Sequence, residues 1–208
     1  MCLPTGDTPK PVYQRVAAAV ADGAASFAKA TVFLLDEFGG LEPDDPARCE
    51  ASLRRDLLDH VDLPETHFHC IDPATDDSDG MVRRFGSAAT ASGIDLTILG
   101  LGSNGHIGLN EPGSAATSAA RIVTLSDESH ASVARYGSKA TADWGLTLGL
   151  AEILSSRTIW LLATGAHKAE IVRTTLEGPI GDAVPASHLR THPNATALLD
   201  GAAASLLT

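Results

Sequence analysis

The sequence predicts an α/β fold: a single doubly wound, mostly parallel sheet with helices on both faces, in a Rossmann-like arrangement. Two observations lead to this prediction. Short apolar and β-branched runs alternate with longer stretches of helical periodicity along the whole chain, as in successive strand–helix–strand units. The composition, 208 residues with 44% hydrophobic and 20% charged positions, is that of one globular domain, and no repeat or linker divides it.

Strands are expected where β-branched and large apolar residues run together beside Gly, Pro, Asp or Ser. These runs are Met1–Leu3, Thr31–Leu35, Phe68–Ile71, Leu96–Leu99, Ile122–Leu125, Ile159–Ala163 and Thr196–Leu199. The first run leads straight into a Gly-containing loop, with no strand and helix before it. The domain, taken as residues 1–208, is therefore expected to be short at its N-terminus.

Helices are expected where apolar positions recur at helical spacing. These stretches are Pro11–Lys29, Pro46–His60, Gly80–Ser92, Thr141–Ile153 and Lys168–Glu177. Between the second strand and the second helix, Asp36–Pro46 contains two Gly, two Pro and five carboxylates, and we expect a surface loop there.

Charge and cysteine content narrow the class of protein. The net charge of −11, from 15 Lys and Arg against 26 Asp and Glu, argues against nucleic acid as a partner, because such binding depends on phosphate neutralisation. A small phosphorylated ligand needs only a few local donors. Cys2, Cys49 and Cys70 are too few for a disulfide framework, and their spacing suggests no zinc site. Without a signal peptide or an apolar span, a cytoplasmic protein free of the membrane is expected.

Four loops with unusual polar content each follow a predicted strand directly. In an open parallel sheet such loops lie together at the carboxyl edge, where ligands bind. We therefore expect one site to collect all four. The loops are Pro4–Pro9, Asp36–Phe38, Gly100–His106 and Thr164–Lys168.

The first loop carries a helix start signal, because Thr8 suits the N-cap position and Pro9 the first helical position. Free backbone N–H groups at such a start attract an anion, so the turn is a candidate phosphate site. A plain strand-to-helix turn is the alternative. Asp7 favours that alternative, since its carboxylate would repel a phosphate unless it faces away or caps the helix.

Asp36 and Glu37 end an apolar run, so at least one of the two carboxylates emerges at the end of a buried strand. Partial burial raises a carboxyl pKa toward the range that suits a general base. The alternative is a solvated strand end. The sequence alone does not say which of the two carboxylates faces a ligand.

The segment Gly100–Pro112 is richer, because its four glycines allow the backbone to approach a ligand. Amide, imidazole and carboxylate groups gather there within eight residues. They belong to Asn104, His106, Asn110 and Glu111.

Two cations are expected close to the same edge. Lys168 follows the turn at Thr164 and would place an ammonium at a helix start, where a cation is unfavourable unless an anion lies nearby. Arg135 follows the fifth predicted strand and could reach over this edge. A solvated lysine and an ordinary surface arginine are the alternatives, and the spacing of the remaining histidines compels no metal site.

Four segments, in this order, resemble glucosamine-6-phosphate deaminases and their amino-sugar phosphate isomerase relatives, galactosamine-6-phosphate enzymes included. They are LPTGDTP, LLDEFGGL, LGLGSNGHIGLNEPGS and ATGAHKAE. Supporting segments extend the match through nearly the whole chain. The GHIGLNEPGS block is the most specific, because the related 6-phosphogluconolactonases resemble it through GH and then continue differently.

The resemblance implies a reaction without metal or cofactor, in which an aldose 2-amino-6-phosphate opens, isomerises through an enolamine and loses ammonia. Asp36 matches the family's general base, His106 its ring-opening histidine and Glu111 the carboxylate partner of that histidine. The residues implied for binding the phosphate are Thr5, Gly6, Asp7, Thr8, Arg135 and Lys168. The partner is then a small phosphosugar, and a homo-oligomer is compatible with the sequence.

Two residues depart from the family pattern. Asn104 stands where an acidic residue is frequent, which predicts a less polarised histidine, and Asp7 stands where Gly or Ser is usual. The alternatives to an active deaminase are therefore an impaired enzyme, a 6-phosphogluconolactonase-type hydrolase and a non-catalytic sugar-phosphate-binding effector domain. We favour the deaminase because Asp36, His106 and Glu111 are all present. The sequence does not distinguish glucosamine from galactosamine 6-phosphate.

Overall fold

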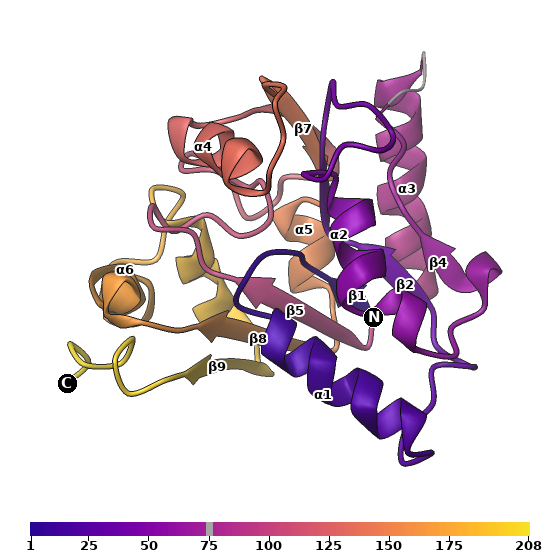
Figure 1. The fold of residues 1–208 in the computed structure, drawn as a ribbon. Coiled ribbons are helices and arrows are strands. Elements are labelled where there is room, and N and C mark those ends of the chain that lie inside the picture. Colours follow the sequence, from indigo (N-terminus) through magenta and orange to yellow (C-terminus); the bar gives the residue numbers. More distant parts are fainter. Residues whose placement is uncertain (74–76) are drawn as a thin grey trace.

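A six-stranded parallel sheet runs through the centre of the molecule, described here from a computed structural model (Figure 1). The structure describes residues 1–73 and 77–208. In spatial order the strands are β4 (Phe68–His69), β2 (Val32–Leu34), β1 (Cys2–Leu3), β5 (Leu96–Gly100), β8 (Thr158–Ala163) and β9 (Ala195–Leu199). The chain first builds the sheet on one side of β1 and then on the other, so strand order reverses between β1 and β5, as in doubly wound sheets.

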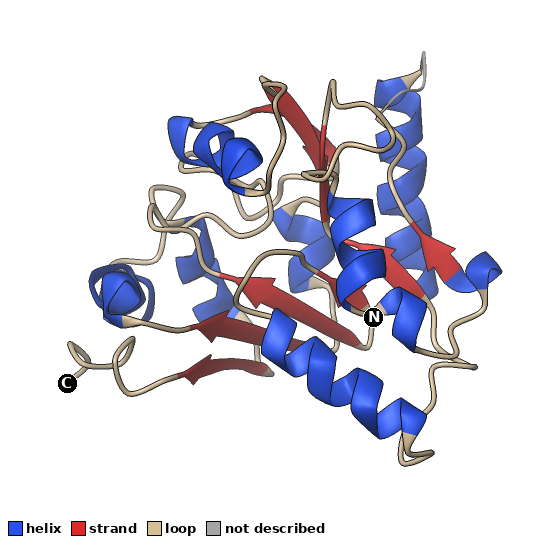
Figure 2. Cartoon of the chain, in the orientation of Figure 1, coloured by secondary structure: helices blue, strands red, loops and turns tan. Residues whose placement is uncertain are grey.

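Helices α1 (Lys10–Ala21) and α2 (Cys49–Asp56) cover one face of this sheet. Their apolar side chains join a core that contains Leu3 of β1 and Ile98 of β5. Because successive strand residues point to opposite faces, Cys2 points into the other core. Figure 2 shows the helices gathered on two sides of the strands.

The opposite face is covered by α3 (Ser78–Ser92), α5 (Leu150–Leu154) and α6 (Ala169–Glu177). Their side chains pack around Phe33 of β2 and Leu99 of β5, both buried. With helices on both faces of a parallel sheet, the predicted fold class is confirmed.

A second, three-stranded antiparallel sheet corrects three expectations. Its order is β3 (Asp36–Phe38), β7 (Trp144–Thr147) and β6 (Arg121–Thr124). The stretch expected as a loop from Asp36 therefore begins as a strand. The stretch expected as a helix over Thr141–Ile153 contains strand β7 in its middle, and only its end enters α5. The fifth predicted strand exists as β6, but it lies in this small sheet. In each case pairing between segments distant in sequence overrides the local pattern.

Helix boundaries also differ from the expected ones. The first helix ends at Ala21 rather than at Lys29, because Gly23 follows with a left-handed φ of 72°. The second begins at Cys49 rather than at Pro46. Helix α4 (Asp127–Arg135) was not expected as a helix. Short 3₁₀ turns occupy Leu58–His60, Glu65–His67, Ala166–Lys168 and Pro185–Thr191.

Candidate active site

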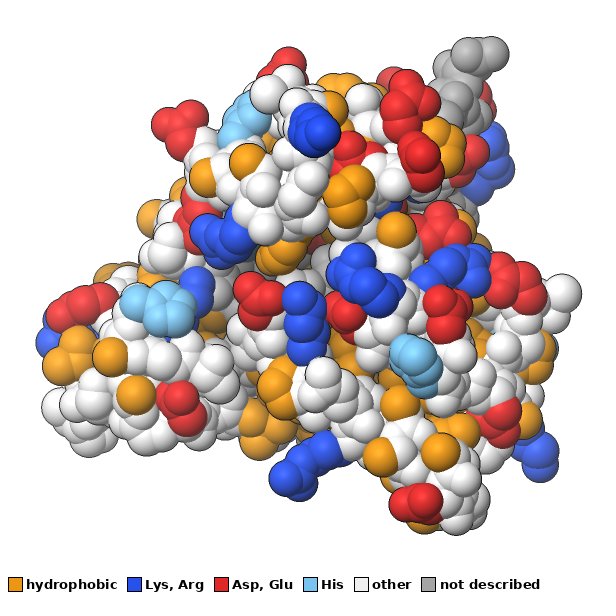
Figure 3. Space-filling view, viewed as in Figure 1, with side chains coloured by type: hydrophobic (Ala, Val, Ile, Leu, Met, Phe, Trp, Pro, Cys, Tyr) orange, Lys and Arg blue, Asp and Glu red, His pale blue; other side chains and the backbone are white. Residues whose placement is uncertain are grey.

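A cavity of about 390 Å³ lies at the carboxyl ends of β1, β2, β5 and β8 and is partly walled by α4. It brings together residues from all four polar loops that follow strands. Those predicted site residues that line it are Thr5, Gly6, Asp7, Thr8, Asp36, His106, Arg135 and Lys168. Around it, the face in Figure 3 mixes basic with acidic side chains and shows no broad basic patch.

The first turn approaches the cavity with its backbone, since Gly6 has a φ of 102°, which favours glycine. The Asp7 carboxylate, 69% exposed, accepts a hydrogen bond from Lys10 Nζ at 2.8 Å, so its charge is partly offset by a neighbour on α1. The prediction that Thr8 caps the helix is wrong. Helix α1 begins at Lys10 with Pro9 in the cap position, and no side chain bonds to the helix start.

Asp36 lies in the cavity wall at the point where the chain leaves β2 and enters β3. Burial, helped by the charge of Glu37, raises the pKa of Asp36 to about 7, and the charge of His106 opposes this rise. A carboxyl group with this pKa exchanges a proton readily near neutral pH. It has the electrostatics of a general base.

Glu37 points away from Asp36, as alternate residues of a strand do, and is fully buried. Its carboxylate accepts hydrogen bonds from the backbone N–H groups of Phe38, Cys49 and Glu50 at 2.8 to 3.0 Å. Arg48 Nε lies 3.0 Å from its Oε2. Glu37 therefore fastens the start of α2 to β3, and only Asp36 of the two carboxylates faces the cavity.

His106, Glu111 and Asn104 form a connected group beside Asp36. The Nδ1 atom of His106 lies 3.5 Å from Glu111 Oε2, which also accepts a 2.8 Å hydrogen bond from Asn104 Nδ2. The Oδ1 atom of Asn104 accepts from the backbone N–H of His106 at 3.0 Å. Asn104 thus bonds to the carboxylate and to the loop backbone. A Cβ on Gly102 would lie 2.4 Å from the imidazole, so this glycine makes room for the ring.

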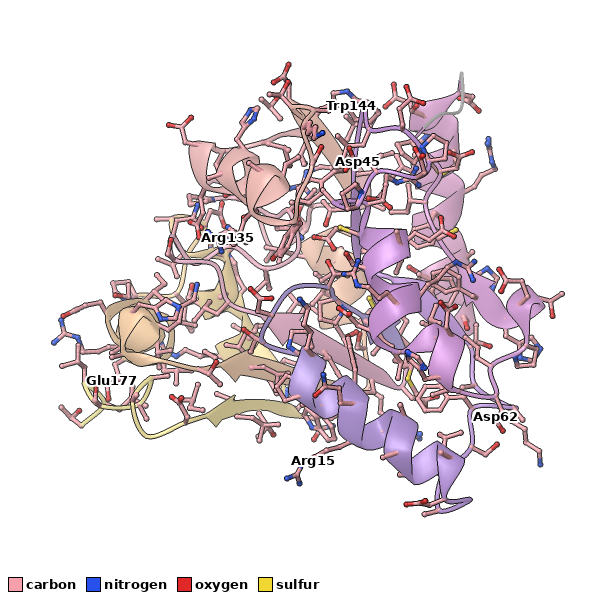
Figure 4. All side chains as sticks on the ribbon, in the orientation of Figure 1. Arg15, Asp45, Asp62, Arg135, Trp144 and Glu177 are labelled. Carbon is pink, nitrogen blue, oxygen red and sulfur yellow. The ribbon has the colours of Figure 1, made fainter. Side chains whose placement is uncertain are left out.

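The two predicted cations reach the cavity from different elements. Arg135 ends α4 and is exposed, and Figure 4 places it on the side of α4 that faces β5 and α6. Lys168 stands at the start of α6, where burial lowers the pKa of its ammonium while the charge of Glu128 opposes this shift. The arrangement leaves two cationic side chains at the rim of one cavity.

Sequence reasoning missed several polar residues of α4 and its flanks. Glu128 and Tyr136 line the cavity, and Ser126 and Ser129 bond to Glu111. The signal was present, because Ser126 followed by two acidic residues is a typical helix start.

No group of three metal-ligating side chains occurs within residues 1–73 and 77–208, which are the ones described. In the same part of the chain no helix has the length and apolar character to cross a bilayer. Cys2, Cys49 and Cys70 are all free thiols.

The fold and the cavity define a class: doubly wound α/β proteins with a polar ligand cavity at the carboxyl edge of the sheet. Within this class, the chain belongs to the family of glucosamine-6-phosphate isomerases and 6-phosphogluconolactonases, whose model matches residues 1–198.

Curated relatives include a glucosamine-6-phosphate deaminase of Rhodopirellula baltica, 43% identical over 99% of this chain and 83% of the relative. Another, from Streptomyces avermitilis, is 40% identical over 98% of this chain and 79% of the relative. Among solved structures, a monomeric glucosamine-6-phosphate deaminase matches with a TM-score of 0.93 and 36% identity, covering 99% of this chain and 87% of that one. A 6-phosphogluconolactonase of Thermotoga maritima shares the fold, with a TM-score of 0.75 and 19% identity over 95% of this chain and 83% of that one.

Proposed function

We propose that the protein is a glucosamine-6-phosphate deaminase-type enzyme, which converts a 2-amino-2-deoxyhexose 6-phosphate and water to a ketose 6-phosphate and ammonia. The observation that carries this proposal is one cavity lined by both Asp36, whose pKa is raised to about 7, and His106, whose Nδ1 atom lies 3.5 Å from Glu111. Relatives of about 40% identity named for this activity support it.

The first step in this proposal opens the sugar ring. His106, oriented by Glu111, moves the proton between the anomeric hydroxyl and the ring oxygen, so that the C1–O5 bond breaks and an aldehyde forms at C1. Glu111 is suited to this part because an ionised carboxylate stabilises the imidazolium as it forms.

The second step moves a proton along the open chain. Asp36 takes the proton from C2 while O1 takes up a proton from the substrate's own ammonium group, which gives an enolamine with a C1–C2 double bond. The protonated Asp36 then delivers its proton to C1. The resulting C2 iminium adds water and expels ammonia, which leaves a ketone. One carboxyl group near its pKa can serve both transfers, because it gains and loses the proton with little free-energy difference.

Phosphate binding falls to the turn Thr5–Thr8 together with Arg135 and Lys168. Backbone N–H groups and two cations supply charge-assisted hydrogen bonds to a dianion from several directions. This explains how a chain with a net charge of −11 could bind a phosphorylated substrate without a basic face.

Ammonia release with glucosamine 6-phosphate and galactosamine 6-phosphate, measured side by side, tests the proposal and identifies the C4 epimer. We expect ammonia from at least one of them, and at least about a hundredfold slower release with Asp36→Asn at the same protein concentration. Hydrolysis of 6-phosphogluconolactone without ammonia release would favour the lactonase. Binding of either sugar phosphate without turnover would favour an effector domain or an impaired enzyme.

A cytoplasmic location belongs to the same proposal and is supported by the three free cysteines. The oligomeric state is open between a homo-oligomer and the monomer described for a solved relative. Sedimentation velocity at micromolar protein separates the two.

A further inference from the structure

Three side chains donate hydrogen bonds to the carboxylate of Glu111, and they divide between its two oxygens. Oε1 accepts from the hydroxyls of Ser126 at 2.8 Å and Ser129 at 2.6 Å. Oε2 accepts from Asn104 and is the oxygen that lies 3.5 Å from His106 Nδ1. Nothing in the reaction outlined above uses the two serines.

The serine hydroxyls are themselves held in place. Ser126 is the N-cap of α4, where its oxygen accepts from the Ser129 backbone N–H at 3.3 Å. A hydroxyl has one proton and two lone pairs, so accepting this bond leaves the Ser126 proton for Glu111. Ser129, one turn into the helix, is only 3% exposed. Both donors therefore lie at the start of α4, Ser126 as its cap and Ser129 in its first turn.

We propose that Ser126 and Ser129 are positioning residues that fix the plane of the Glu111 carboxylate and keep its Oε2 directed at His106. The inference rests on the proposed function, since it assigns these residues to the ring-opening step. Without the two serines, the carboxylate is held only at Oε2 by Asn104 and can turn about its terminal torsion. With Oε1 tied to α4, only Oε2 remains for the imidazole.

The charge state of Glu111 agrees with this arrangement. Burial by itself would raise the pKa of Glu111, but the neighbouring His106 imidazole and the Ser129 and Ser126 hydroxyls lower it to about 2. Glu111 therefore stays ionised across the working range of pH. It orients the imidazole and does not take its proton.

Ser126 has a second role as a helix cap, so its removal would weaken α4 as well. Ser129 is the sharper probe, because its side chain contacts Glu111 without capping the helix. Ser129→Ala deletes the donor, Ser129→Cys keeps a similar volume with a weaker donor, and Ser129→Thr retains the hydroxyl. Ser155→Ala is the matched control: its hydroxyl also bonds at a helix end, to Glu152 O at 2.7 Å, but away from the cavity.

Two measurements test whether Ser126 and Ser129 hold the Glu111 carboxylate in place. The first compares kcat with the affinity for the open-chain alcohol made by reducing the substrate aldehyde, which needs no ring opening. We expect kcat to fall about tenfold to a hundredfold in Ser129→Ala and Ser129→Cys, the worth of one hydrogen bond to a charged group. The Kd of the alcohol should stay within about threefold, and Ser129→Thr and Ser155→Ala should match the wild type. An unchanged kcat, or a Kd that worsens as much as kcat, would overturn the proposal.

The second measurement does not depend on activity. Carbon-13 NMR of the Glu111 carboxyl should show its titration midpoint rising by about one pH unit or more in Ser129→Ala and not in Ser155→Ala. A midpoint that does not move would overturn the proposed positioning of Glu111 by the serines, even if activity fell. If the wild-type chain released no ammonia, the proposed function would fail, and this titration would still decide whether the serines hold Glu111.

Discussion

Asp36 is the residue on which the proposed chemistry depends most directly. Asp36→Asn preserves the shape of the side chain and removes its basicity, so turnover should fall by about two to four orders of magnitude, with substrate analogues still bound. Steady-state kinetics beside calorimetry of the open-chain alcohol measures both quantities. Turnover equal to that of the wild type would remove Asp36 from the role of base.

The raised pKa of Asp36 also predicts how kcat/KM changes on the acidic side of its pH profile. Since the base must be ionised and burial raises the pKa of Asp36 to about 7, kcat/KM should fall as the pH drops through about 7. A profile flat down to pH 5 would contradict this assignment.

Local sequence could not decide between Asp36 and Glu37. Both follow the same apolar run, and the choice depends on which face of β3 each occupies. That face is fixed by pairing with β7, where Asp36 stands opposite Thr147 and Glu37 opposite Leu146. The family resemblance pointed to Asp36, whereas the physical reason lies in a strand that the sequence did not predict.

At the scale of elements, Glu37 connects β3 of the small sheet to α2 by accepting hydrogen bonds from the first backbone N–H groups of that helix. It is fully buried and paired with Arg48, which is 4% exposed. Glu37→Gln should therefore lower the free energy of unfolding by about 3–5 kcal/mol, because it removes the nearer counter-charge of a buried guanidinium and leaves only Glu50, at 3.7 Å. Urea denaturation measures the change. The E37Q/R48M double variant should recover part of the loss, and a single variant within 1 kcal/mol of wild type, on the scale of a surface pair, would refute the argument.

The proposed phosphate site predicts opposite changes in phosphosugar affinity when Lys168 and Asp7 are replaced. Lys168→Ala should lose about tenfold or more in affinity for a phosphosugar and little for the unphosphorylated amino sugar, because it removes a charge-assisted contact. Asp7→Gly should gain less than about fivefold, since the Asp7 carboxylate is exposed and paired with Lys10. Titration calorimetry of both variants with both sugars provides the comparison. Equal losses for the two sugars in Lys168→Ala would exclude the phosphate role.

The parallel strands and the loops at their ends could be predicted because each strand is a short apolar run that is bounded locally. The small antiparallel sheet could not be predicted from the local sequence. Trp144–Thr147 lies inside a stretch with helical spacing, and its strand conformation comes from pairing with β3 on one side and β6 on the other. The site was predictable where it consists of strand ends, and α4 with its two serines was missed.

At the scale of the whole molecule, the raised pKa that suits Asp36 to its proposed role as a base also lowers the stability of the fold. The folded chain holds the Asp36 proton up to about pH 7, whereas the unfolded chain releases it near 3.8. Between these values the unfolded state binds fewer protons, so this group lowers the free energy of unfolding as the pH rises. Glu111 acts in the opposite sense: its stabilisation is complete above 4.5 and is lost as the pH falls toward about 2.

We therefore expect Asp36→Asn to be more stable than the wild type at the pH where the wild type is active. The difference should be smallest at pH 4, where Asp36 is protonated in the folded chain and only partly ionised in the unfolded chain, and should grow to about 1–3 kcal/mol above pH 7. Urea denaturation at pH 4, 6 and 8 measures it, with Asp22→Asn, an exposed carboxylate at the end of α1, as the control. A difference that did not change with pH would mean that Asp36 ionises in the fold as it does in the unfolded chain. In that case burial at the cavity wall would not prepare it as a base, and the proton transfers would need another group.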